Sequence, residues 1–305
     1  MLDKLYRKPW VGLLGLMVGF LTQPLGHTAY KVMELGFGEQ VYWAAGVTGV
    51  VGLVIIWNGL KQDELKATWM GMLGGWILWI GWFEYAFKFF SVLYDVPRFQ
   101  VEASIPGGPA GYAAAPQANI LQSTVSIMFA LLIVYGIFNL QTKCNFMRFF
   151  HRNLKFSPGM PTPDNHRSFA RITAMEQLFV TWFCYQFWLY AIYFGTRGTG
   201  AMVVQVLFFA WSGWAFYLVW KCTQQVRVAA ALRYGIGAGI VLWGTAEMPA
   251  HFGAYREYWL HPDEYPIFNL VAFALFVGGL AVIANRPEPA SRLAGGAPAR
   301  PATGG

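Results

Sequence analysis

The chain has 305 residues, of which 56% are apolar and 12% charged, whereas a typical soluble domain has roughly 45–50% apolar and about 25% charged residues. This composition excludes an ordinary soluble enzyme and indicates an integral membrane protein. The formal charge of +7 does not indicate nucleic-acid binding, because the Lys and Arg residues stand between long apolar runs and form no basic stripe.

Eight segments are long and apolar enough to be transmembrane helices, since a span needs about 20 mostly apolar residues. We therefore expect an all-α fold, a polytopic integral membrane bundle of eight transmembrane helices in which residues 1–285 form a single membrane domain. In chain order the predicted spans are 9–29, 40–60, 68–92, 118–140, 172–195, 201–221, 231–251 and 266–285.

The connections between these spans predict the orientation of the bundle. Alternate connections, together with both termini, carry 17 of the 22 Lys and Arg residues. The positive-inside rule then places both termini in the cytoplasm, and we expect a bacterial inner (plasma) membrane. On this topology residues 93–117 form an irregular outer loop, residues 141–171 a basic cytoplasmic loop, and residues 286–305 a disordered cytoplasmic tail.

The two halves of the chain, 9–140 and 172–285, resemble each other at a fixed offset. A shift of 163 residues without a gap pairs eleven identical residues across 20–90, about twice the number expected from so biased a composition. The pairs include Gln23 with Gln186 and Glu84 with Glu247. This pattern predicts a parallel 4+4 internal repeat, and a coincidence among apolar helices is the alternative.

Four ionisable residues stand deep inside predicted spans, where charge is costly and points to function. At about 1.5 Å per residue, Glu84, Glu247, His27 and His251 all fall in the outer third of the bilayer. Prolines beside two of them remove helical hydrogen bonds, and such breaks are tolerated only where protein or a water-filled cavity covers them. We therefore expect a shared pocket that opens outward.

Three of these residues also have an ionisable neighbour four positions further on, which shares their helix face. These neighbours are Lys88 for Glu84, His251 for Glu247 and Lys31 for His27. For Glu84 with Lys88 and for Glu247 with His251, the simplest interpretation is an ion pair within the helix that neutralises its own charge.

The same residues could bind a cofactor. His27, His251 and Glu247 are a ligand set that suits Zn, Cu or Fe, and His27 with His251 could ligate a haem b. We expect such a metal or haem only as one alternative, because the spacing permits it without requiring it.

Tryptophans within the spans have two interpretations. Trp79, Trp82 and Trp243 could line a site for a flat apolar molecule such as a quinone, a carotenoid or haem, or could simply pack and contact lipid. Glycines four residues apart predict close helix contacts in the first, third and seventh spans, which also carry the ionisable residues. The glycine pairs are Gly15 with Gly19, Gly71 with Gly75, and Gly235 with Gly239.

These features of the sequence are compatible with three functions. The first is a membrane subunit or enzyme of a redox system, in which Glu84 and Glu247 are the catalytic residues that conduct protons or complete a metal shell. The second is a proton-coupled transporter in which the same Glu pair carries the proton. The third is a cofactor-free structural subunit of a larger complex. The expected partners are the lipid bilayer, other membrane subunits and a hydrophobic small molecule, with no nucleic acid.

Overall fold

The structure is a computed structural model that describes residues 2–97, 99–101, 112–114, 116–138, 145–155, 167–195, 200–251 and 254–285. The predicted tail 286–305 and much of the predicted loops 93–117 and 141–171 lie outside these residues. Apart from one antiparallel pair of short strands, β1 (Phe99–Val101) and β2 (Tyr112–Ala114), the regular structure in the described ranges is helical. The all-α prediction is therefore confirmed.

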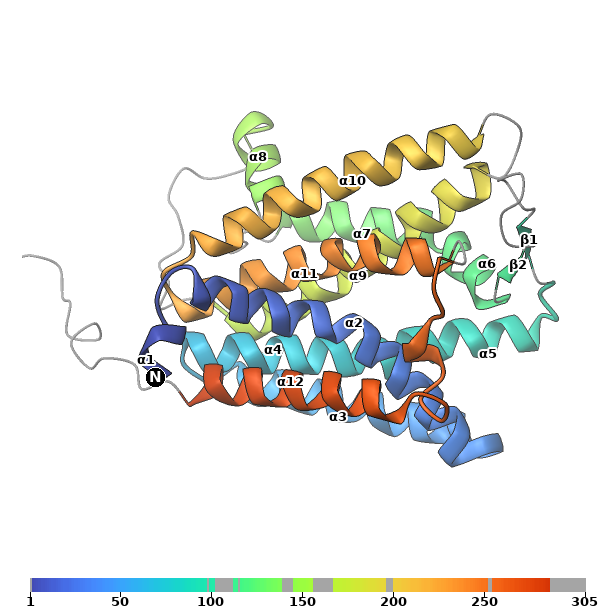
Figure 1. Cartoon of the computed structure of the whole chain (residues 1–305), viewed down its shortest axis with the longest axis horizontal. Helices are drawn as coiled ribbons and strands as arrows, with labels where there is room; N and C mark the ends of the chain where they lie inside the picture. The colour runs from blue at the N-terminus through green and yellow to red at the C-terminus, as the bar shows by residue number, and fades with distance from the viewer. Residues whose placement is uncertain are drawn as a thin grey trace, which may run out of the picture.

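Each of the eight predicted segments is helical over most of its described residues, and the long helices lie lengthwise beside one another (Figure 1). Short 3-10 turns stand at Gly38–Gln40 and Tyr258–Leu260. The helices are α1 (Leu2–Leu5), α2 (Trp10–Phe37), α3 (Val41–Gly59), α4 (Glu64–Leu78), a π-helical turn (Trp79–Glu84), α5 (Tyr85–Leu93), α6 (Pro116–Ser123), α7 (Val125–Phe138), α8 (Asn145–Asn153), α9 (Phe169–Gly195), α10 (Gly200–Thr223), α11 (Val228–His251) and α12 (Pro266–Ala284).

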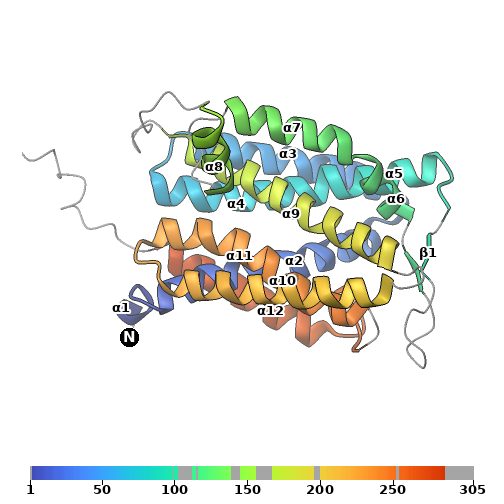
Figure 2. The same cartoon turned by 90° about the horizontal axis from the view of Figure 1, so that it is seen from above.

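Helix α2 begins and α12 ends at the same end of the bundle, where α4 and α11 also begin (Figures 1 and 2). The Tyr6 hydroxyl ties these two ends together by donating a 2.8 Å hydrogen bond to the carbonyl of Val282. Lys61, Lys66 and Lys221 stand in or beside the connections at this end. We call it the basic end, and we call the opposite end, where α2 and α11 finish, the far end.

Length and hydropathy mark four helical stretches as able to cross a membrane, namely Trp10–Gly59, Met202–Thr223, Val228–His251 and Pro266–Ala284. The first of them contains both α2 and α3. A fifth is added if the bent pair α6 and α7 counts as one broken span. The part of the chain that the structure describes therefore has several helices that could span a membrane, and the eight spans stay a prediction.

The outward faces of these helices are strongly apolar. Large side chains on α3, α10 and α12 are mostly uncovered, among them Trp43 at 82%, Phe209 at 71% and Ile267 at 76% exposure. Contiguous apolar surface of this kind is rare on soluble monomers and is typical of contact with lipid or a partner. The buried side chains lie inside the bundle, where Val18 and Leu232 are fully covered.

Glycines bring α2 and α11 into backbone contact, as their four-residue spacing predicts. A Cβ atom on Gly19 would lie 2.3 Å from the carbonyl oxygen of Gly235, so no other residue fits there without moving a helix. The glycines of the third predicted span contact a different helix. Gly71 packs against the Ala170 backbone of α9, because α4 lies along α9 instead of joining the α2–α11 contact.

The predicted repeat is only partly matched by the helix positions. The offset of 163 residues brings α2 onto α9, α3 onto α10 and α4 onto α11. It would place the counterpart of α6 and α7 at 279–301, whereas α12 begins at Pro266. The repeat therefore stays a prediction that rests on three helices of each half.

A cluster of charges joins α4 to α11 at the basic end. The Glu64 carboxylate accepts hydrogen bonds from Arg227 and, at 2.6 Å, from Arg233. The Arg233 side chain is only 8% exposed; it also donates to Thr68 at 2.9 Å and lies 4.6 Å from the centre of the Phe169 ring of α9. One arginine thus holds three helices together.

Candidate functional site

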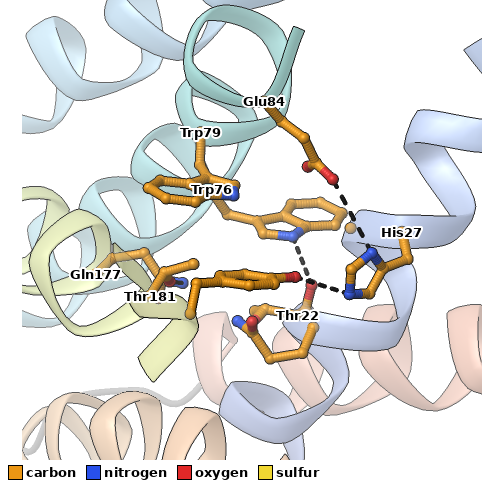
Figure 3. A pocket seen from close by; sticks show the side chains of 10 residues that line it. Thr22, His27, Trp76, Trp79, Glu84, Gln177 and Thr181 are labelled. Atoms are coloured by element: carbon orange, nitrogen blue, oxygen red, sulfur yellow. Dashed lines mark hydrogen bonds and ion pairs between the residues drawn. The ribbon is translucent and has the colours of Figure 1, made fainter. Parts of the chain in front are cut away.

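Three of the ionisable residues predicted from depth meet in one cluster. His27 of α2 and Glu84 of the π-helical turn point toward each other (Figure 3), with 3.9 Å between Nδ1 and Oε1. The other ring nitrogen of His27, Nε2, lies 3.2 Å from Oε1 of Glu247 in α11. Exposure of the three side chains is only 13% to 19%. The imidazole therefore stands between two carboxyl groups.

A tyrosine completes this cluster. The Tyr185 hydroxyl of α9 lies 2.7 Å from His27 Nε2, so it donates to that nitrogen when the imidazole proton is on Nδ1. The Tyr185 ring stacks on Trp79 with the centroids 6.0 Å apart, which fixes where the hydroxyl points. The cluster thus consists of His27, Glu84, Glu247 and Tyr185, contributed by four different elements.

The local backbone explains why two of these side chains face inward. Glu84 ends a π-helical turn, which holds one residue more than an α-helical turn and so changes the face on which later residues emerge. Pro24 lies inside α2 just before His27 and has no N–H to donate to the preceding turn. Irregular helices of both kinds are frequent where a membrane protein binds or transfers a substrate or ion.

The ion pairs predicted within single helices are replaced by pairs between elements or within other turns. Lys88 contacts Glu34 of α2, and Lys31 donates to the same carboxylate at 2.9 Å. His251 Nδ1 lies 3.8 Å from Oε1 of Glu257, in the connection that follows α11. Glu84 and Glu247 are consequently left to His27, because their predicted neighbours have other partners.

Two small cavities adjoin the cluster. The first, about 10 Å³, has room for roughly one water molecule, and the second, about 90 Å³, for roughly three. Tyr185 and Gln23 line both, so the two cavities meet at the cluster. The first is also lined by Thr22, Gly26, His27, Trp76, Trp79, Glu84, Gln177 and Thr181, and the second by Cys184, Trp188, Leu189, Ile192, Ile240, Trp243, Gly244, Glu247, Met248 and His251.

The tryptophans predicted to bind a flat molecule are divided among three places. Trp79 lines the first cavity and Trp243 the second. Trp82 lines neither cavity. Its indole N–H donates a 3.0 Å hydrogen bond to the carbonyl of Gly46 in α3, and the side chain is 41% exposed. Sites for drug-sized ligands occupy about 300–1,000 Å³, so these cavities do not fit a quinone, a carotenoid or haem.

The predicted metal ligands are likewise not assembled. His27 is held by Glu84, Glu247 and Tyr185, while His251 lies against Glu257. Over the described ranges, no group of three or more His, Cys, Asp and Glu side chains is arranged to hold a metal ion. The three predicted ligands are therefore not gathered into a metal site in the described ranges, and the haem b alternative with two histidines stays a prediction.

Tyr185 and the polar residues below it on α9 are not among the residues predicted from the sequence. Thr173, Gln177, Thr181 and Tyr185 are spaced by four and so share one helix face. The first three are 1%, 1% and 2% exposed, although they lie in a helix that is otherwise apolar and aromatic. This regular spacing of polar residues was the signal that could have identified them.

Comparison with known proteins adds no family to this description. No protein-family model, no curated protein and no solved structure matches the chain.

Proposed function

We propose that this chain is a multi-pass membrane protein that moves protons across the bilayer, the activity on which proton-coupled transporters depend. The observation that carries the proposal is the His27 imidazole held between the carboxyl groups of Glu84 and Glu247. Of the three functions that the sequence leaves open, this one uses all the buried ionisable groups of the cluster and needs no cofactor.

The geometry supports a transfer in which protons balance at every step. A protonated Glu84 gives its proton to Nδ1 of His27, through a small movement or one water, since 3.9 Å is too long for a direct hydrogen bond. The imidazolium then releases the proton on Nε2 to Glu247 at 3.2 Å. One proton has moved from one carboxyl group to the other, and the neutral ring has changed tautomer.

Tyr185 positions the ring during this transfer. Its hydroxyl, 2.7 Å from Nε2, can accept from Nε2–H before the transfer and donate to the bare Nε2 after it, and its stacking on Trp79 limits rotation. Ring orientation matters because the two nitrogens face different carboxyl groups. Tyr185 is thus a positioning residue in this proposal.

The second cavity supports access to the cluster from the far end. It is lined by both Glu247 and His251, and His251 Nδ1 lies 3.8 Å from Glu257 outside the helices. The Glu257 side chain is 26% exposed. Water in this cavity would connect the cluster to the surface at the end where α11 finishes.

The proposal also includes the topology. Eight spans with both termini in the cytoplasm of a bacterial cell are supported by the helical state of all eight segments and by the basic residues at the end where α2 begins and α12 ends. The parallel repeat, with Glu84 and Glu247 as equivalent carriers, belongs to the same proposal.

The test is proton flux into liposomes that contain the purified protein, measured with an enclosed pH dye while a potassium gradient and valinomycin set the membrane potential. We expect flux above that of protein-free liposomes, and its loss in the double variant Glu84→Gln, Glu247→Gln. The matched control is Glu39→Gln, which changes an exposed carboxylate in the turn Gly38–Gln40. Wild-type liposomes without flux, or a double variant with full flux, would overturn the proposal.

A further inference from the structure

The polar face of α9 runs from the cluster toward the basic end. Tyr185 stands in the cluster, and Thr181, Gln177 and Thr173 follow at one-turn intervals. Twelve residues at about 1.5 Å each make this face about 18 Å long, which is more than half the thickness of a bilayer core. The three residues below Tyr185 are almost completely buried.

Two atoms on this face have no hydrogen-bond partner among the described residues. They are Oγ1 of Thr173 and Oε1 of Gln177. The amide of Gln177 donates to Oγ1 of Thr181 over 3.4 Å, a long hydrogen bond. Buried polar atoms without a partner are costly, and an ordered water is the usual partner where a protein atom is lacking. The pattern therefore indicates water between these side chains.

The upper end of the polar face reaches ionisable groups, and its lower end lies one turn away from one. At its upper end Gln177 and Thr181 line the first cavity, together with His27 and Glu84 (Figure 3). At its lower end Phe169, one turn before Thr173, lies against the guanidinium of Arg233. Arg233 is paired with Glu64 at the basic end.

We propose that Thr173, Gln177 and Thr181 form the half of the proton path that joins the cluster to the basic end, with waters bridging them. This inference rests on the proposed function. The four residues between successive side chains rise about 6 Å along the helix, close to the length of two hydrogen bonds through one water. Each hydroxyl or water accepts one proton as it releases another, so no charge remains in the path; Gln177 orients water and transfers no proton.

The end of this path lies at the Glu64–Arg233 pair. Its Arg227 partner is 46% exposed, so the cluster of charges reaches solvent there. The His251–Glu257 route connects the cluster to the far end, and the three α9 residues connect it to the basic end. Together they form a proton path across the bundle. Without the three α9 residues, the cluster would have access to one side only.

The test changes the hydroxyls without changing shape. In Thr173→Val and Thr181→Val we expect proton flux in liposomes to fall by about tenfold, the factor that one lost hydrogen bond corresponds to. Thr173→Ser and Thr181→Ser keep the hydroxyl and should retain the flux. Thr48→Val, in a half-buried part of α3, is the matched control, since its hydroxyl bonds only to the Ala44 carbonyl among the described residues.

A second measurement separates this inference from the proposed function. Infrared titration follows the C=O stretch of protonated Glu84 and Glu247, which the far-end route still reaches in the valine variants. Low flux with an unchanged carboxyl titration supports the inference. Unchanged flux in the valine variants, or loss of both flux and titration, overturns it. A wild-type protein with neither flux nor titration overturns the proposed function itself.

Discussion

Replacement of Gly235 by alanine tests whether α2 and α11 are packed as closely as the structure describes. The added Cβ atom would lie 2.3 Å from the carbonyl carbon of Gly15, whereas ordinary contacts begin at 3.4 Å, so the helices must separate by about 1.1 Å. The obstructing atoms are backbone, and no side-chain rotation can relieve the contact. Gly237, two residues along the same helix, has nothing within 4 Å of its Cβ position and is the matched control.

The expected magnitude follows from these contacts. Overpacking in a close-packed core costs typically about 1–3 kcal/mol, against a gain of up to about 1 kcal/mol for alanine over glycine in a helix. Because both alanine variants have the same gain in helix propensity, Gly235→Ala should be less stable than Gly237→Ala by the overpacking cost alone, about 1–3 kcal/mol. A rigid shift of α11 by the same amount would also lengthen the 3.2 Å contact between His27 and Glu247 to about 4 Å and so reduce proton flux.

The assay is unfolding in mixed micelles with increasing SDS, together with proton flux for each variant in liposomes. If the two alanine variants differ by less than about 0.5 kcal/mol, the close contact of α2 with α11 is refuted. A destabilised Gly235→Ala with full flux would show instead that the cluster does not depend on this contact.

Two further predictions concern charges at opposite ends of the bundle. Arg233→Met should lower the free energy of unfolding by about 3–5 kcal/mol in the same assay, because Arg233 is 8% exposed and holds Glu64 in a mostly buried pair. Arg227→Met, at a 46% exposed position, should lower it by at most about 1 kcal/mol. Equal costs for the two variants would contradict this ranking. At the far end, burial raises the pKa of Glu257, but its hydrogen bond to His251 and the charge of that residue outweigh burial and leave the pKa below 4.5. The ionised carboxylate therefore stabilises the fold at pH values above its ordinary pKa, and Glu257→Gln should lower the Tm at about pH 6. The difference in Tm from wild type should vanish as the pH falls through the lowered pKa of Glu257. A difference in Tm that persists at low pH would refute this contribution of Glu257.

The helices, and much of the candidate site, could be predicted from the sequence because both depend on distance along a helix. Depth follows from a fixed rise per residue, and depth alone brought His27, Glu84 and Glu247 to one level. Helical spacing with proline positions also indicated a pocket there. These inferences need no knowledge of which helices are neighbours.

The partners of these residues could not be predicted, because they depend on which helices are neighbours. Tyr185 reaches His27 only because α9 packs against α4 and α11, between which α2 also places His27, and Lys88 finds Glu34 because α5 lies beside the end of α2. The predicted metal set failed for the same reason, since His251 faces the connection after α11. Sequence spacing constrains contacts within one helix and says little about contacts between helices.

The π-helical turn lets one helix face two directions. A regular α-helix advances about 100° per residue, so the nine residues from Gly75 to Glu84 would place Glu84 about 180° away from the side that packs on α9. One surplus residue in the turn removes about 100° of that angle and leaves about 80°. The phase shift allows the lower half of the helix to keep its tight contact with α9, while its upper half presents an acid to the histidine of α2.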